Sequence, residues 1–159
     1  MDIWIIDNWK TYYSNKTHRS GIKVDFELGV NESVKSAIKN MVNWLRKTYT
    51  FPVRVRIYVK KGIKVKARDG DLVPDLFFWP YNRDDEPYIK IATGDYFELL
   101  SKLGKDDALA TILLALLRNL THYFQWLNDI KLTPIGEERQ ATRCARLKLR
   151  EYAETRDHP

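Results

Sequence analysis

The chain lacks the residues and segments that mark several classes of protein. It has one cysteine, Cys144, in 159 residues, which excludes an intramolecular disulfide and a zinc site made of several cysteines. Its longest purely apolar run, ILLALL at 112–117, is far shorter than the roughly 20 residues of a membrane-spanning helix. The N-terminal MDIWIIDNWK lacks a basic start followed by a long apolar stretch, so no signal peptide is expected. These absences favour a cytoplasmic protein with no membrane partner.

Several catalytic motifs are also absent from the sequence. There is no glycine-rich phosphate-binding loop, and no serine lies in a nucleophile motif. Cys144 lies among apolar positions of a predicted helix, where an inert thiol is expected. His18 and His158 fall in a predicted loop and tail, at no spacing typical of a metal site.

What the sequence does contain suits one domain, 1–159, with one core. Hydrophobic residues make up 44% and charged residues 30%, and there are five Trp and nine Tyr. The net charge of +6 has two interpretations. It indicates either an anionic partner such as nucleic acid, or the charge that many small domains carry for solubility.

Hydrophobic periodicity predicts an α+β domain. Strands are expected over 2–6, 53–61, 75–80 and 88–93, and helices over 34–49, 94–104, 106–128 and 136–154. The segment 7–21 is expected to be mostly loop, and Asp106 is the expected N-cap of the long helix. This order predicts a small mixed or antiparallel sheet with helices packed on one side.

The predicted helix 106–128 carries a polar stripe. Leucines and aromatic residues crowd one side of its helical wheel, whereas Arg118, Asn119 and His122 share the other side. The simplest interpretation is that this stripe is the solvent-exposed face of an amphipathic helix.

RNLTHYFQ at 118–125 resembles the zinc-binding helix of zincin metallopeptidases, in which the corresponding stretch reads H-E-L-T-H-Y-F-Q. In that family the two histidines bind zinc and the glutamate is the general base. Arg118 takes the position of the first histidine and Asn119 that of the glutamate, so only His122 is retained. The resemblance implies a zincin-like fold over about residues 75–155, with a substrate cleft beside the strand at 88–93.

Glu-zincins take a third zinc ligand from a glutamate on the next helix, often within E-x-x-A, and Glu138 to Ala141 match that pattern. The resemblance therefore makes His122 and Glu138 vestigial metal ligands. Alternatively, Glu138 is an ordinary acid in the first turn of a helix, favoured by the helix dipole.

The altered motif argues against zinc-dependent hydrolysis. A guanidinium does not bind a cation and an amide is not a useful base, so neither Arg118 nor Asn119 replaces the lost function. No metal is expected. The hypothesis that follows is that Arg118 reaches Glu138 and neutralises a carboxylate that zinc would otherwise satisfy, with Asn119 and His122 completing a polar cluster.

A second feature is a basic stripe on the predicted last helix. Arg139, Arg143, Arg146 and Arg150 recur at spacings of 4, 3 and 4. Such a stripe is a candidate footprint for a phosphate backbone or an acidic protein. The strand 53–61 adds Arg54, Arg56, Tyr58 and Lys60 on its polar face. Alternatively, both are solvated faces with Glu137, Glu151 and Glu154 as local counter-ions.

Three functional hypotheses remain open. The first is a pseudo-metallopeptidase that binds a protein or peptide between the strand 88–93 and the helix 106–128, without a cofactor. The second is a nucleic-acid-binding module that uses the arginine stripe. The third is a residual zinc-dependent peptidase built on His122, Glu138 and another carboxylate, Asp129 or Glu137.

Overall fold

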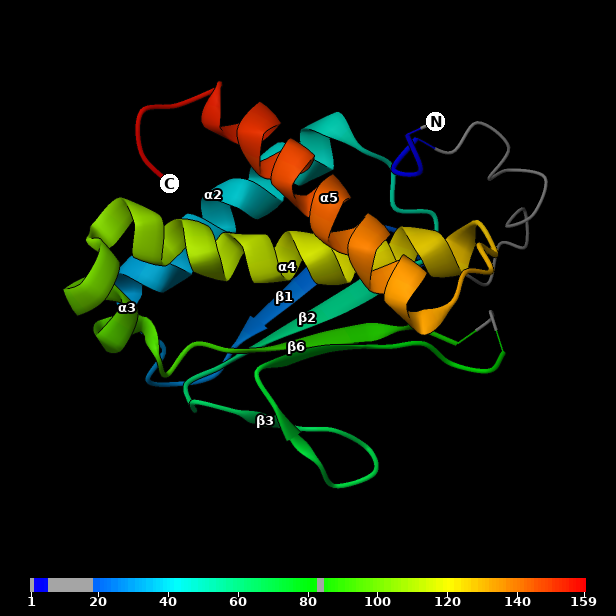
Figure 1. The fold of residues 1–159 in the computed structure, drawn as a ribbon, viewed down its shortest axis with the longest axis horizontal. Coiled ribbons are helices and arrows are strands. Elements are labelled where there is room, and N and C mark those ends of the chain that lie inside the picture. The colour runs from blue at the N-terminus through cyan, green and yellow to red at the C-terminus, as the bar shows by residue number, and fades with distance from the viewer. Residues whose placement is uncertain (1, 6–18, 83–84) are drawn as a thin grey trace.

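The computed structural model describes residues 2–5, 19–82 and 85–159, and these form an α+β fold, as predicted. A four-stranded sheet carries helices on one side, and a small β-hairpin lies on the other side (Figure 1). The elements in chain order are β1 (Ile22–Phe26), α2 (Glu32–Thr48), β2 (Val55–Lys60), β3 (Val65–Lys66), β4 (Leu72–Val73), β5 (Asp75–Phe78), β6 (Tyr88–Ala92), α3 (Tyr96–Leu103), α4 (Lys105–Leu127) and α5 (Pro134–Ala153).

The sheet is mixed and has the strand order β1-β2-β6-β5. β1, β2 and β6 are parallel, whereas β5 runs antiparallel to β6 and forms an edge of the sheet. Residues of β2 alternate between buried Val55, Ile57 and Val59 and half-buried Arg56, Tyr58 and Lys60. This alternation is the pattern of a sheet covered by helices on one face only.

The long helix α4 is the centre of the core. It contacts the sheet through β5 and β6 and also packs against α2, α3 and α5, and Figure 1 shows it running across the sheet with α5 crossing it. Its apolar side is fully buried: Leu113, Leu116, Leu117, Leu120, Tyr123 and Phe124 have no exposed surface. This burial fixes α4 on the sheet, so its remaining faces are held toward β5 and α5.

Two local predictions at element ends are wrong. Residues 2–5 of the predicted strand 2–6 form a turn in which both Ile3 and Trp4 are buried; this short apolar run inserts two side chains into the core and does not pair as a strand. α4 begins after Gly104, not at an Asp106 N-cap. Gly104 has a φ of 85° that suits glycine, so α3 ends and α4 starts at one residue.

β1 lies in a part of the chain for which the sequence patterns predict no element. Most of the predicted loop 7–21, including His18, lies outside the described residues. The other predicted helices and strands are found, with ends that shift by up to two residues.

Candidate functional site

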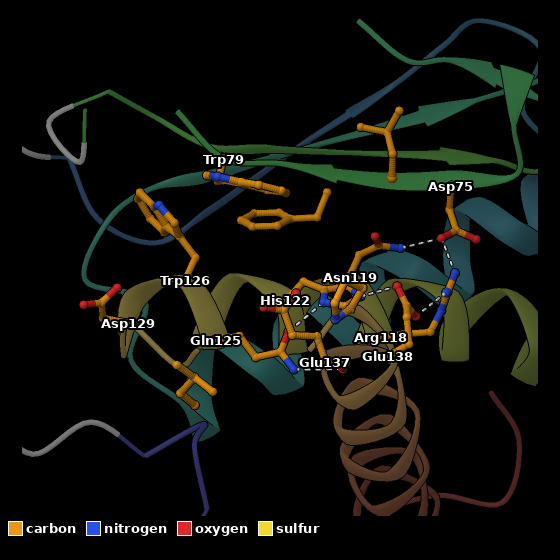
Figure 2. A pocket seen from close by; sticks show the side chains of 14 residues that line it. Asp75, Trp79, Arg118, Asn119, His122, Gln125, Trp126, Asp129, Glu137 and Glu138 are labelled. Atoms are coloured by element: carbon orange, nitrogen blue, oxygen red, sulfur yellow. Dashed lines mark hydrogen bonds and ion pairs between the residues drawn. The ribbon is translucent and has the colours of Figure 1, made fainter. Parts of the chain in front are cut away.

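The polar stripe of α4 faces a pocket between β5, α4 and the start of α5 (Figure 2). Its volume is about 460 Å³. Fourteen residues line it: Asp75, Leu76, Phe77, Trp79, Arg118, Asn119, His122, Gln125, Trp126, Asp129, Ile130, Pro134, Glu137 and Glu138. The stripe is therefore not an ordinary solvent-exposed helix face, because Asn119 is only 2% exposed and Gln125, one turn after His122, is only 4% exposed.

Arg118 pairs with two carboxylates from different elements. Its Nη1 lies 3.3 Å from Oε2 of Glu138 on α5, which is the contact expected from the sequence. Its Nη2 forms an ion pair with Asp75 Oδ1 on β5. The Arg118 and Asp75 side chains are 32% and 10% exposed, so the guanidinium neutralises a largely buried carboxylate. One cation thus links α4 to the sheet and to α5.

Asp75 is the member of this cluster that sequence reasoning missed. It also accepts a hydrogen bond of 2.8 Å from the Asn119 side-chain amide, which donates in addition to the Ala115 carbonyl at 2.8 Å. The only signal in the sequence was an acid at the start of an apolar strand. Its pairing with Arg118 spans 43 residues, a separation that helical periodicity cannot reveal.

His122 completes the cluster. The Gln125 side-chain N–H groups donate to the Glu137 carbonyl at 2.9 Å and to Gln140 Oε1 at 3.0 Å, which turns Gln125 Oε1 toward His122 Nδ1 at 2.7 Å. Nδ1 must therefore carry a proton. His122 Nε2 then faces Glu138 Oε1 at 3.2 Å. Glu138 accordingly receives contacts from both Arg118 and His122, although its own side chain is 57% exposed.

This arrangement has a clear electrostatic organisation. Arg118 is a fixed cation between Asp75 and Glu138, and the amide of Asn119 is held by two hydrogen bonds. Within the described residues, no group of three or more His, Cys, Asp or Glu side chains is placed to hold a metal ion. The cluster offers hydrogen-bonding groups that are able to hold a ligand in one orientation. Its one permanent positive charge is the guanidinium of Arg118.

The strand beside the pocket is β5, which corrects the prediction that 88–93 forms the edge of the cleft. β6, at those residues, lies inside the sheet between β2 and β5. Ala92 N–H donates to the Pro74 carbonyl, so by the alternation of an antiparallel pair the backbone groups of Asp75 and Phe77 face away from β6. No other described strand pairs with that side of β5.

Three aromatic side chains form a wall of the pocket (Figure 2). The Phe77 ring stacks against Trp79 at 6.3 Å and meets Trp126 edge-on at 6.5 Å. Trp79 is 61% exposed, so a large apolar surface borders the free edge of β5. Surfaces of this kind mark sites for ligands or proteins more often than they mark ordinary solvent-exposed faces.

The arginine stripe adjoins the pocket at Pro134 and Glu138 and extends from there along α5. Arg139, Arg143, Arg146 and Arg150 are all exposed on α5, and none forms an ion pair with another of the described residues. The basic residues of β2 behave differently. Arg54 and Arg56 both pair with Glu86, at 2.9 and 3.2 Å, and Lys60 lies 3.6 Å from Glu27.

Two residues outside these surfaces behave as ordinary side chains. Burial raises the pKa of the Cys144 thiol, as expected for an inert cysteine. His158 Nδ1 lies 2.8 Å from Asp106 Oδ2, away from the pocket.

Among the helices of the described residues, none is both long and apolar enough to cross a membrane.

Comparison of the chain with protein-family models, curated proteins and solved structures finds no match.

Proposed function

We propose that this chain is a zincin-like domain without hydrolase activity that binds an extended polypeptide segment in the pocket between β5 and α4, in the reducing cytoplasmic compartment. The observation that carries the proposal is the ion pairing of Arg118 with both Asp75 and Glu138. A guanidinium occupies the place where a zincin would need a neutral imidazole.

Loss of hydrolysis follows from the chemistry of the two exchanged residues. Zinc catalysis of this type needs three protein ligands, an open position and a base that accepts a proton from water. Arg118 repels a metal ion. The Asn119 amide has no useful basicity and donates to Asp75 and Ala115. The residual-peptidase hypothesis, built on His122, Glu138 and Asp129 or Glu137, therefore has neither a base nor a complete ligand set.

Binding of an extended chain is supported by the edge of β5. Asp75 and Phe77 present backbone donors and acceptors on the side away from β6, which is the surface that an added strand uses. The aromatic wall beside it offers room for alternate side chains. The pocket lining includes four carboxylates, Asp75, Asp129, Glu137 and Glu138, and one arginine. This excess of negative charge favours a segment that carries lysine or arginine near the aromatic wall.

The test uses nine-residue peptides of alternating Val and Thr with a central Arg, labelled with a fluorophore. Titration with the full chain, followed by fluorescence anisotropy, is expected to show saturable binding, and mass spectrometry should recover the peptide intact. Trp79→Ala combined with Trp126→Ala should weaken binding at least tenfold. Phe97→Ala, which removes another aromatic residue that is 68% exposed but outside the pocket, is the matched control.

Two further peptides carry N-methyl groups on alternate residues, one at the odd positions and the other at the even positions. Strand addition predicts that only one of the two loses binding, because only alternate N–H groups face β5. Equal affinity of both methylated peptides, or no binding by the parent peptide, contradicts the proposal. Stoichiometric zinc together with chelator-sensitive cleavage would instead establish the peptidase.

A further inference from the structure

We propose that the outer face of α5 is a docking surface for an acidic amphipathic helix of a partner protein. This surface, here called the arginine face, consists of Ile135, Arg139, Thr142, Arg143, Arg146, Leu147 and Arg150. It is separate from the β5 edge, and the inference does not depend on the peptide-binding proposal.

The arginine face is a shallow groove that combines charge with apolar surface. Its volume is about 730 Å³, and Pro134, Glu138 and the seven residues of the face line it. Ile135 is 67% exposed and Leu147 is 46% exposed, so two large aliphatic side chains lie in water among the arginines. A helix face used only for solubility has no need of exposed isoleucine and leucine.

None of the four arginines of the arginine face forms an ion pair with another described residue. Several other cations of the fold are paired: Arg118 with Asp75, Arg54 with Glu86, and Lys148 with Asp2. The acids that the sequence suggested as counter-ions are partly engaged elsewhere. Glu151 accepts a hydrogen bond from the Tyr49 hydroxyl at 2.7 Å and lies 3.5 Å from Lys148. The four arginines therefore remain available to an external anion.

The shape of the surface favours a helix as its occupant. Arg139, Arg143, Arg146 and Arg150 recur at helical spacing along about 16 Å of α5, or three turns. A second helix lying along α5 presents carboxylates at the same spacings, and its own aliphatic residues cover Ile135 and Leu147. A phosphate backbone would satisfy the arginines but would leave both aliphatic side chains in contact with charged groups. Charge and apolar surface together thus favour an acidic amphipathic protein segment over nucleic acid.

The experiment uses a synthetic 20-residue helical peptide with glutamates at spacings of 4, 3 and 4 and leucines between them. Its binding to the full chain is measured by isothermal titration calorimetry at two salt concentrations. We expect saturable binding that weakens at the higher salt concentration. A peptide with glutamine at every glutamate position should bind at least tenfold more weakly.

Two pairs of substitutions separate the charged and apolar contributions. Arg143→Glu with Arg146→Glu, and Ile135→Ser with Leu147→Ser, should each reduce affinity at least tenfold. Lys61→Glu with Lys64→Glu makes the same change of net charge at exposed positions of the loop between β2 and β3, and should leave affinity within about twofold of the parent chain. Circular dichroism checks that every variant is folded.

A single-stranded 20-nucleotide DNA and an RNA of the same length are titrated in parallel. Tighter binding of either nucleic acid, lost in the arginine variant but unchanged in the Ile135 and Leu147 variant, would overturn the proposal in favour of a nucleic-acid interface. Failure of the wild-type chain to bind the acidic peptide would overturn it directly.

Discussion

At the scale of single residues, Arg118 is the side chain on which the candidate site depends. It contacts Asp75, which is 10% exposed, and Glu138, which is 57% exposed. Arg118→Met removes the cation and leaves Asp75 with the Asn119 amide as its one side-chain partner among the described residues. We expect the free energy of unfolding to fall by about 2 kcal/mol, because a largely buried carboxylate then lacks its counter-ion. Urea denaturation followed by circular dichroism measures the change.

A double-mutant cycle tests the cause of this loss. Asp75→Asn added to Arg118→Met removes the unpaired charge and should recover part of the lost stability. If the two substitutions act additively, the ion pair is not the source of the effect. A stable Arg118→Met single variant would likewise contradict the role given to Arg118.

We also expect Arg118 to prevent the site from accepting a metal. Arg118→His with Asn119→Glu would place a second imidazole and a carboxylate beside His122 and Glu138. We expect this variant to retain about one zinc ion per chain after dialysis, measured by elemental mass spectrometry, with the wild-type chain at background. Adding Glu138→Ala should abolish the uptake. A folded double variant without zinc would contradict the proposed zincin-like arrangement of these positions.

At the scale of elements, the sequence predicts those structures whose signal is local. The long periodic helices are found because burial of one apolar stripe of each fixes both its type and its extent. The described part of the segment 2–6 is misassigned because a short apolar run looks the same whether it pairs as a strand or inserts side chains into the core from a turn. The contact between Arg118 and Glu138, which are 20 residues apart, was expected from the resemblance of these two helices to those of glu-zincins. The Asp75 partner and the edge position of β5 depend on strand order, which periodicity does not encode.

One element end is sensitive to pH. His158 lies beside Asp106 in the first turn of α4, and this hydrogen bond raises the pKa of His158 above its ordinary value of 6.5. Because the folded pKa is the higher one, the interaction is fully present below pH 6.5 and is lost as the pH rises through the folded value. An NMR titration of the imidazole should show the raised pKa, and Asp106→Asn should return it toward the ordinary value. If His158 titrates identically in the parent protein and in the Asp106→Asn variant, the contact between His158 and Asp106 is contradicted.

At the scale of the whole molecule, Trp4 connects the start of the chain to three helices. Its ring lies 4.8 Å from Phe124 of α4 and 5.1 Å from Tyr49 at the end of α2, and Lys148 of α5 lies 5.7 Å from it. Lys148 also pairs with Asp2 at 2.6 Å. Although burial opposes its charge, its hydrogen bonds to Asp2 and Tyr49 raise the pKa of Lys148. The N-terminal residues thus complete the core by contacts far apart in sequence.

Two tryptophans give a matched comparison of core and surface. Trp4 is 1% exposed, and Trp4→Ala should lower the free energy of unfolding by about 3 kcal/mol or more. Trp79 is 61% exposed, and Trp79→Ala should lower it by less than about 1 kcal/mol while it weakens peptide binding. Guanidinium denaturation of both variants checks the contrast. Equal losses would mean either that Trp4 is not part of the core or that Trp79 supports the fold.

The pairing of Arg118 with Asp75 and Glu138 has a consequence for how this protein depends on its surroundings. A site held together by a bound metal gains stability in proportion to the logarithm of the free metal concentration, so it weakens when supply falls or a chelator competes. A cation that is part of the polypeptide is present at a fixed local concentration in every copy. We therefore expect the cohesion of β5, α4 and α5 at this pocket to be set when the chain is synthesised and to be independent of the supply of trace metals.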